Sequence, residues 1–213
     1  LAGVYGLYQV SVSLDDNGHT DGFWNFVSGL FGSKPRVGLV AGHWQNDSGA
    51  VCPDGLEEAD INLDVAERTA GLLRRAGYRV DLLSEFDPQL EGYEADVFLS
   101  IHSDSCVYGV SGFKLARLPD SQVGDKADRL VEALYREYEE VTGLEPHYHT
   151  ITYDMSDYHA FHEISPETPG AIIEIGFMGE DRDILTRRSD LVARGIARGI
   201  IAYLEQESER EAG

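Results

Sequence analysis

Short apolar runs alternate with longer amphipathic stretches over most of this chain. Each run is bounded by polar or turn-forming residues, which is typical of a buried strand. The runs predict strands at residues 36–41, 78–83, 96–101, 112–117 and 171–175. Because amphipathic stretches separate most of these strands, the pattern predicts an α/β fold with a largely parallel sheet.

Three stretches repeat their apolar residues at the spacing of a helix. The first begins near Glu57 and ends before Gly77, and the second covers about 122–142. The third begins near Ser189, which is a good N-cap residue, and its apolar face reaches Leu204. These helices complete a layered α/β arrangement.

The chain divides into three parts. Turn-forming residues gather at 32–35, so we predict an N-terminal extension or linker at 1–35. A single domain, which we predict to be catalytic, follows at 36–204, and residues 205–213 form an acidic C-terminal tail. The opening residues fit either the flank of a removed signal or anchor, or an ordinary strand. Since the chain starts with Leu1, we expect it to be a processed or shortened form.

The charge balance is strongly acidic and restricts the partners. The chain has 38 acidic and 17 basic residues, a formal net charge of −21. Such a chain repels phosphate backbones and anionic lipid surfaces, so we expect no nucleic-acid partner. No stretch of the chain approaches the roughly 18 consecutive apolar residues of a membrane span. We therefore expect no membrane span in these residues.

Polar side chains with catalytic potential stand where predicted strands end. His43 follows the first strand, His102 follows the third, and Glu174 interrupts the apolar run at 171–175. In open α/β sheets, ligands bind outside the carboxyl ends of the strands. Glu58 begins the helix that follows the His43 loop. Two histidines and one glutamate are the ligand set of many catalytic zinc sites, which keep one position open for water.

Each of these residues also has an ordinary structural interpretation. A histidine at a strand end is often a hydrogen-bonded surface residue, and Glu58 fits a first helical turn because of the helix dipole. Glu174 is less easily explained, since an ionised carboxylate in an apolar strand is costly unless it is paired or faces a metal. The convergence of the four residues favours a metal site.

Four segments of the sequence resemble a known enzyme family. The segments VGLVAGH (37–43), EADINLDVA (58–66), LSIHSD (99–104) and AIIEIGFM (171–178) are similar to those of the zinc-dependent N-acetylmuramoyl-L-alanine amidases, which cleave bacterial peptidoglycan. The resemblance covers about 36–204 and implies a single domain with a twisted central sheet and helices on both faces. It implies that His43, Glu58 and His102 bind zinc and that Glu174 is the catalytic glutamate.

The resemblance also implies a reaction and a location. Zinc would polarise the scissile carbonyl and lower the pKa of its bound water to about 7. Glu174 would move the proton from the water to the leaving amine. The substrate would be peptidoglycan or a muropeptide, cut between N-acetylmuramic acid and L-alanine. The family implies an extracellular or cell-envelope protein, secreted or anchored through a segment before residue 1. The sequence does not indicate the oligomeric state.

Several segments depart from the family pattern. Trp44 and the loop at 46–53 replace the usual Gly-Gly after the first histidine, and the usual Thr-Arg turn after the second strand is absent. The histidine-rich segment at 147–162 matches no family pattern, so His159 and His162 either line the cleft or are ordinary solvated histidines. Two alternatives therefore stay open: a zinc peptidase or amidohydrolase acting on another peptide or acyl-amine, and a silent cell-wall binding module.

Further residues are candidates for supporting roles. Asn62 and Asp104 are candidates to orient a zinc ligand through hydrogen bonds. Asn62 lies four residues after Glu58 and therefore on the same helix face. Trp44 and His159 are candidates to contact the substrate.

The two cysteines are expected to form a disulfide. Cys52 precedes Glu58 by six residues, and Cys106 follows His102 by four. Because ligands of one zinc ion lie close together, the loops that hold these cysteines must also run close together. The alternatives are free thiols or a cysteine in the metal shell. We favour the disulfide, since an enzyme of the cell wall works in an oxidising space.

Overall fold

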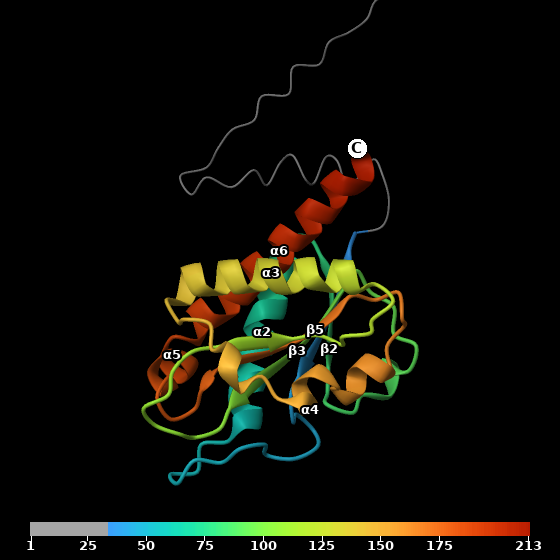
Figure 1. Cartoon of the computed structure of the whole chain (residues 1–213). Coiled ribbons are helices and arrows are strands. Elements are labelled where there is room, and N and C mark those ends of the chain that lie inside the picture. Colours follow the sequence, from blue (N-terminus) through green and yellow to red (C-terminus); the bar gives the residue numbers. More distant parts are fainter. Residues whose placement is uncertain (1–33) are drawn as a thin grey trace, which may run out of the picture. The chain divides into compact units, whose positions relative to one another are not determined.

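The computed structural model describes residues 34–213, which form a five-stranded sheet with helices on its two faces (Figure 1). The strands are β1 (Arg36–Ala41), β2 (Arg79–Leu83), β3 (Val97–Asp104), β4 (Lys114–Ala116) and β5 (Gly170–Phe177). Their order is β2-β1-β3-β5-β4, and only the β4–β5 pair is antiparallel. The predicted α/β fold with a largely parallel sheet is confirmed. The predicted extension at 1–35 lies almost entirely outside the described residues.

Three long helices match the three predicted ones. They are α2 (Glu58–Arg75), α3 (Gly124–Thr142) and α6 (Ser189–Ala212). Short helices lie between them: α4 (Tyr153–Ser156), α5 (Arg182–Arg187), η1 (Pro88–Leu90), η2 (Tyr148–Thr150) and η3 (His159–His162). Because α6 extends to Ala212, the acidic residues at 205–212 continue the last helix.

One detail of the last helix differs from the prediction. The N-cap residue of α6 is Arg188, so the prediction that Ser189 caps the helix is wrong. The Ser189 hydroxyl instead donates a hydrogen bond of 2.6 Å to Asp64 Oδ2 on α2. The side chain therefore links two helices and is not available to the first turn of its own helix.

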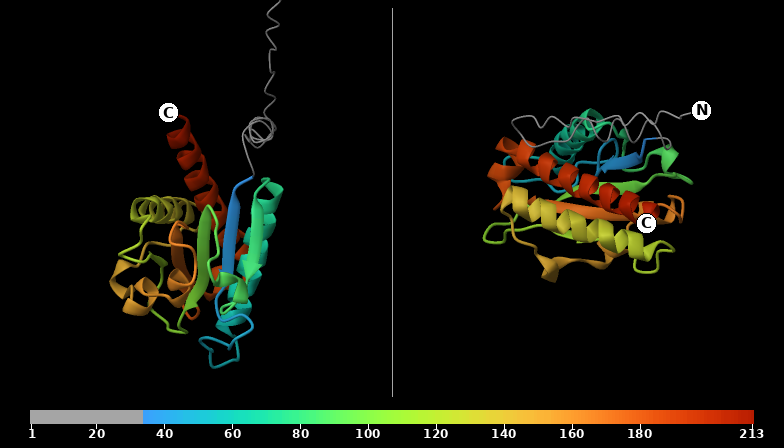
Figure 2. Two further views of the ribbon diagram at one scale, coloured as in Figure 1. Left: turned by 90° about the vertical axis from the view of Figure 1, so that its right-hand side faces the viewer. Right: turned by 90° about the horizontal axis from the view of Figure 1, so that it is seen from above.

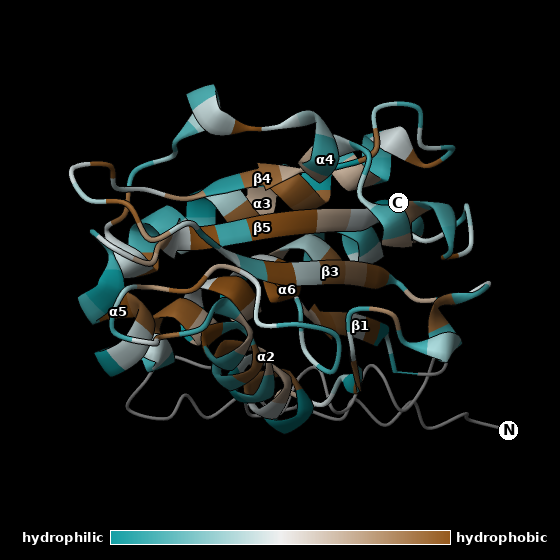
Figure 3. Ribbon diagram, turned by 90° about the horizontal axis from the view of Figure 1, so that it is seen from below, coloured by the Kyte–Doolittle hydropathy of each residue, from teal (hydrophilic) through white to brown (hydrophobic). Residues whose placement is uncertain are grey.

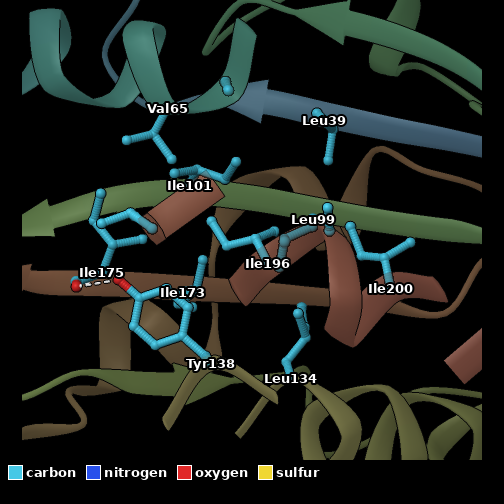
Figure 4. Packing of buried hydrophobic residues seen from close by; sticks show 14 of the residues in the cluster. Leu39, Val65, Leu99, Ile101, Leu134, Tyr138, Ile173, Ile175, Ile196 and Ile200 are labelled. Atoms are coloured by element: carbon cyan, nitrogen blue, oxygen red, sulfur yellow. Dashed lines mark hydrogen bonds between the residues drawn. The ribbon is translucent and has the colours of Figure 1, made fainter. Parts of the chain in front are cut away.

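The three long helices cover one face of the sheet and form the larger core with it. Alternate residues of the strands point into this core, for example Leu39 of β1, Ile101 of β3 and Ile173 of β5 (Figure 4). The buried Tyr138 of α3 donates a hydrogen bond of 2.6 Å to the carbonyl of Ile175 (Figure 4). Figure 3 shows the apolar residues that run along β3 and β5.

The opposite face is covered by shorter elements. Val40 of β1, Phe98 of β3 and Ile172 of β5 belong to a second, smaller core. Side chains from η1, α4 and η3 complete it, among them Met155 and Phe161. The expectation of helices on both faces therefore holds, with long helices on one side and short ones on the other.

The parallel strands all end at one edge of the sheet. In Figure 1 the loop that follows β1 lies at the bottom of the domain. The C-terminal end of α6 lies at the opposite, upper end (Figures 1 and 2). This arrangement gathers the loops after β1, β2 and β3 at the lower edge.

Candidate metal centre and active site

Three predicted ligands form one cluster at the carboxyl edge of the sheet. His43 follows β1, Glu58 is the first residue of α2, and His102 lies in β3. One potential ligand atom of each lies within 4.8 Å of those of the other two. His43 Nε2 is 3.4 Å from Glu58 Oε2, and His102 Nδ1 is 3.1 Å from Glu58 Oε1. Glu58 thus lies between the two imidazole rings.

Local backbone geometry makes this close approach possible. His43 has φ 64°, a left-handed conformation that is unfavourable for residues other than glycine. A Cβ atom at Gly42 would clash with the imidazole ring of His102. A Cβ atom at Gly49 would lie 2.6 Å from Glu58 Oε2 and 2.7 Å from His43 Cδ2. Both glycines therefore leave the space that the cluster needs.

Asn62 lies directly beside the cluster, as its position in α2 predicts. Its Nδ2 group donates hydrogen bonds to Glu58 Oε1 at 3.2 Å and to the Gly42 carbonyl at 3.1 Å. Its Oδ1 atom accepts a hydrogen bond of 2.8 Å from the Ser103 hydroxyl. The buried Asn62 amide therefore connects α2, the loop after β1 and β3.

Within the cluster, the carboxylate of Glu58 and the two imidazoles each favour the charged form of the other. Burial opposes ionisation of Glu58, but its hydrogen bonds with His102 and His43 hold its pKa well below the usual range. The contact with Glu58 raises the pKa of His43 to about 9, and Asp47 contributes, since its Oδ1 lies 2.6 Å from His43 Nδ1. The pKa of His102 is also raised: burial opposes this, but Glu58, Glu174 and Glu85 outweigh it. A metal ion would replace protons on these imidazoles.

Glu174 lies at the same edge, on the central part of β5. In the register of the sheet, Glu174 lies opposite His102 of β3 on one side and opposite Lys114 of β4 on the other. Its Oε2 atom is buried and has no hydrogen-bond partner among residues 34–213. Burial raises the pKa of Glu174 to about 7, and the carboxylates of Glu58 and Asp104 add to this, whereas His102 and Lys114 oppose it. Glu174 can therefore exchange a proton near neutral pH.

The donor set fits a zinc ion. Two imidazoles and one carboxylate are a known ligand set for catalytic zinc. His102 Nε2 is a second buried atom without a hydrogen-bond partner in the described part of the chain. Unsatisfied polar atoms are rare in protein interiors and are typical of catalytic sites or sites for missing ions. Both unsatisfied atoms belong to residues of this centre.

The other predicted supporting residues lie at different distances from the cluster. Asp104 forms an ion pair with the buried Lys114 rather than contacting a ligand residue. Trp44 is partly buried against the larger core. His159 reaches the edge of the site, where its Nε2 lies 2.9 Å from Glu85 Oε1. His162 is more exposed and pairs with Asp157 at 2.7 Å.

The predicted disulfide is confirmed. Cys52 and Cys106 are bonded, with their Cα atoms 5.3 Å apart. Cys52 is buried in the loop between His43 and Glu58, and Cys106 lies in the loop after β3. The bond therefore joins the two loops that leave the histidines.

Sequence analysis missed three residues at this edge: Asp47, Glu85 and Lys114. The exposed Asp47 and the buried Glu85 both lie in irregular loops, where no periodicity marks a role for either residue. The position of Glu85, two residues after the end of β2, is the one signal that could have identified it. Lys114 is a buried cation in a three-residue strand, too short to show an alternating pattern.

The comparison with known families decides the classification. Residues 37–202 match the model of a family described as N-acetylmuramoyl-L-alanine amidase. The chain belongs to this amidase family. The match includes the three cluster residues and Glu174, and the predicted family membership is confirmed.

Individual members of the family are similar to this chain over different lengths. The N-acetylmuramoyl-L-alanine amidase AmiC of Neisseria meningitidis is 34% identical over 86 residues. This similarity covers 36% of the present chain and only 21% of the curated relative, about a fifth of its length.

Solved structures show the same fold. The CwlD amidase from Clostridioides difficile, in complex with the GerS lipoprotein, superposes with a TM-score of 0.63 at 22% identity, covering 81% of this chain and 99% of that chain. The amidase AmiC2 of Nostoc punctiforme superposes with a TM-score of 0.62 at 24% identity, covering 82% and 99%. At sequence identities of 22% and 24%, this structural similarity shows that the fold is shared.

Proposed function

We propose that this protein is a zinc-dependent hydrolase that cleaves the amide bond between N-acetylmuramic acid and L-alanine in peptidoglycan. The observation that carries the proposal is the His43–Glu58–His102 cluster beside Glu174, in a chain of this amidase family. His43, Glu58 and His102 are the proposed zinc ligands. When bound, zinc supplies a Lewis acid for the carbonyl oxygen and lowers the pKa of water.

Glu174 is the proposed general base and general acid. A group with a pKa of about 7 is well suited to accept a proton from the attacking water and to return it to the leaving nitrogen. Its neighbours on both strands carry basic side chains, His102 and Lys114, which limit how far burial raises its pKa. Glu174 is held within β5, beside His102 of β3, and its carboxylate interacts electrostatically with His102 and Glu58.

The surroundings of the site fit a large substrate. Large exposed apolar side chains of the described residues lie in the segments that follow the strands and α3, either in loops or in the short helices η2 and α4: Val51, Phe86, Val107, Tyr108, Tyr148, Ile151 and Tyr153. Exposed apolar groups around a polar centre are typical of a surface that contacts a ligand. A polymer of sugars and peptides would extend across such loops.

The proposed location is the cell envelope or the extracellular space. The disulfide between Cys52 and Cys106 supports it, because such bonds persist in oxidising compartments. None of the helices that the structure describes is long and apolar enough to cross a membrane.

The deciding experiment measures cleavage of purified peptidoglycan sacculi. We expect zinc-dependent release of new L-alanine amino termini, loss of this activity in excess chelator, and recovery when zinc is restored. The variant Glu174→Gln is nearly isosteric but cannot accept a proton, so its turnover should fall by about 10²–10⁴-fold while zinc binding persists.

Two other outcomes would replace the proposal. Cleavage of small acyl-peptides without cleavage of sacculi would indicate the zinc peptidase or amidohydrolase alternative. Binding to sacculi without any cleavage would indicate a silent binding module. A Glu174→Gln variant that keeps more than a tenth of the turnover would exclude Glu174 as the base.

A further inference from the structure

Glu85 is a buried carboxylate that the proposed reaction does not use. It lies two residues after β2, with only 5% of its surface exposed. A buried carboxylate is costly unless it is paired and hydrogen-bonded, so its partners show what it does in the fold. Burial opposes its ionisation, but hydrogen bonds and nearby histidines lower the pKa of Glu85 to about 2, so it is ionised.

One oxygen of Glu85 faces both proposed histidine ligands. Oε2 accepts a hydrogen bond of 2.6 Å from the backbone N–H of His43. The same atom lies 3.5 Å from His102 Nε2. Since His43 has the unfavourable φ of 64°, a short charge-assisted hydrogen bond to its N–H stabilises that conformation. The imidazole of His102 lies between Glu58 at Nδ1 and Glu85 at Nε2.

The other oxygen of Glu85 is held by the 147–162 segment. Oε1 accepts a hydrogen bond of 2.8 Å from the Tyr158 hydroxyl and lies 2.9 Å from His159 Nε2. The Tyr158 hydroxyl accepts in turn from the Ser100 hydroxyl of β3 at 3.0 Å. The ring of His159 stacks on Phe86 with centroids 4.3 Å apart. These contacts fix the orientation of the Glu85 carboxylate.

We infer that Glu85 is a positioning residue for the metal centre, and this inference rests on the proposed function. Metal-binding histidines usually give their second ring nitrogen to a carboxylate, which fixes the tautomer and the ring orientation. Asp47 occupies this position for His43, at 2.6 Å from Nδ1. Glu85 Oε2 faces Nε2 of His102 at 3.5 Å, without a hydrogen bond between the two atoms, and it also accepts the hydrogen bond from the backbone N–H of His43. The 147–162 segment supports the centre through Glu85.

The test compares the zinc affinity of Glu85→Gln with that of the parent chain. Affinity is measured by competition with a chromophoric chelator, and the Co²⁺-substituted proteins are compared by their visible absorption spectra. Loss of a partner of this kind costs about 10–100-fold in metal affinity. We expect a loss of this size and a changed cobalt spectrum. Urea unfolding in excess chelator reports separately whether the variant is folded.

A matched control and a milder variant isolate the effect. Glu163 contacts His159 Nδ1 at 2.8 Å but does not contact Glu85, so Glu163→Gln should keep zinc affinity within about twofold. Tyr158→Phe removes one hydrogen bond to Glu85 and keeps the aromatic ring. We expect it to weaken zinc binding by less than Glu85→Gln does. If Glu85→Gln does not fold, Tyr158→Phe against Glu163→Gln decides the question.

The outcomes separate this inference from the proposed function. A folded Glu85→Gln variant with the zinc affinity and cobalt spectrum of the parent overturns the inference alone. The same holds if Glu163→Gln weakens binding as much as Tyr158→Phe. A parent chain that binds zinc but cleaves no amide overturns the proposed function and leaves the role of Glu85 standing. A parent chain that binds no zinc overturns both.

Discussion

Glu174 combines a partly exposed side chain with a buried oxygen that has no hydrogen-bond partner in the described domain. Its pKa is about 7 in the folded chain and about 4.5 in the unfolded chain, so the folded state binds the proton more tightly. The stabilisation that the protonated form gives is complete below pH 4.5 and is lost as the pH rises through 7. The metal-free protein therefore becomes less stable over this range because of Glu174.

The variant Glu174→Gln should not show this loss. Between pH 4.5 and 8, its free energy of unfolding should rise relative to the parent by about 1–2 kcal/mol, less than the whole shift because solvent reaches part of the side chain. Urea unfolding of both proteins in excess chelator measures the difference. A difference that stays constant across this pH range would contradict the assigned cause.

At the residue scale, the strand pattern was sufficient to predict that the candidate site residues lie close together. His43, His102 and Glu174 stand in or directly after strong apolar runs, so the register of a parallel sheet brings them together. Glu58 follows from the start of a periodic helix. The position of Glu85 after β2 gives the same signal, but the partners of this carboxylate could not be predicted from it. Its environment depends on the 147–162 segment, which crosses to the end of β2 without any regular pattern in its sequence.

The disulfide links two irregular elements, the loop between β1 and α2 and the loop after β3. It closes a segment of 54 residues, for which the chain-entropy model gives about 4 kcal/mol of stabilisation. The double variant Cys52→Ser/Cys106→Ser should lose about this free energy of unfolding, measured in chelator. Its zinc affinity should also fall, because the two loops leave the proposed ligands His43 and His102.

Chemical reduction of the parent chain is the matched control for this double variant. Reduced parent and double variant should unfold at the same denaturant concentration, since both lack the bond. A loss below about 1 kcal/mol would mean that packing alone holds the two loops together.

The long helices could be predicted from the sequence, whereas the short ones could not. The three long helices have several turns of apolar spacing, and their bounds came out within a few residues of the prediction, except that α6 continues through the predicted tail to Ala212. The short helices η1, η2, η3 and α4 have three or four residues each, which is too few to show a helical period. Their positions are decided by packing on the second core, which the local sequence does not specify.

The whole molecule carries a formal net charge of −21. Repulsion among these charges destabilises the folded chain, and salt screens it. Raising NaCl from 0.05 to 0.5 M should therefore increase the melting temperature of the metal-free protein. If screening restores about 1 kcal/mol, the increase is about 2–4 °C.

KCl at equal ionic strength is the control for this salt effect. It should give the same increase, because screening depends on ionic strength and not on a particular cation. An increase with NaCl alone would indicate specific ion binding, and a melting temperature that does not change would contradict a role for charge repulsion.

The edge of the sheet that holds the candidate metal centre and the end of α6 lie at opposite ends of the domain (Figures 1 and 2). The helix has 24 residues and therefore a length of about 36 Å, and its last turns are exposed to solvent. A linker joined to Gly213 would then stand well away from the metal centre. Immobilised on a solid support through that linker, the domain would present its loops outward, accessible to insoluble material that cannot diffuse into a pore.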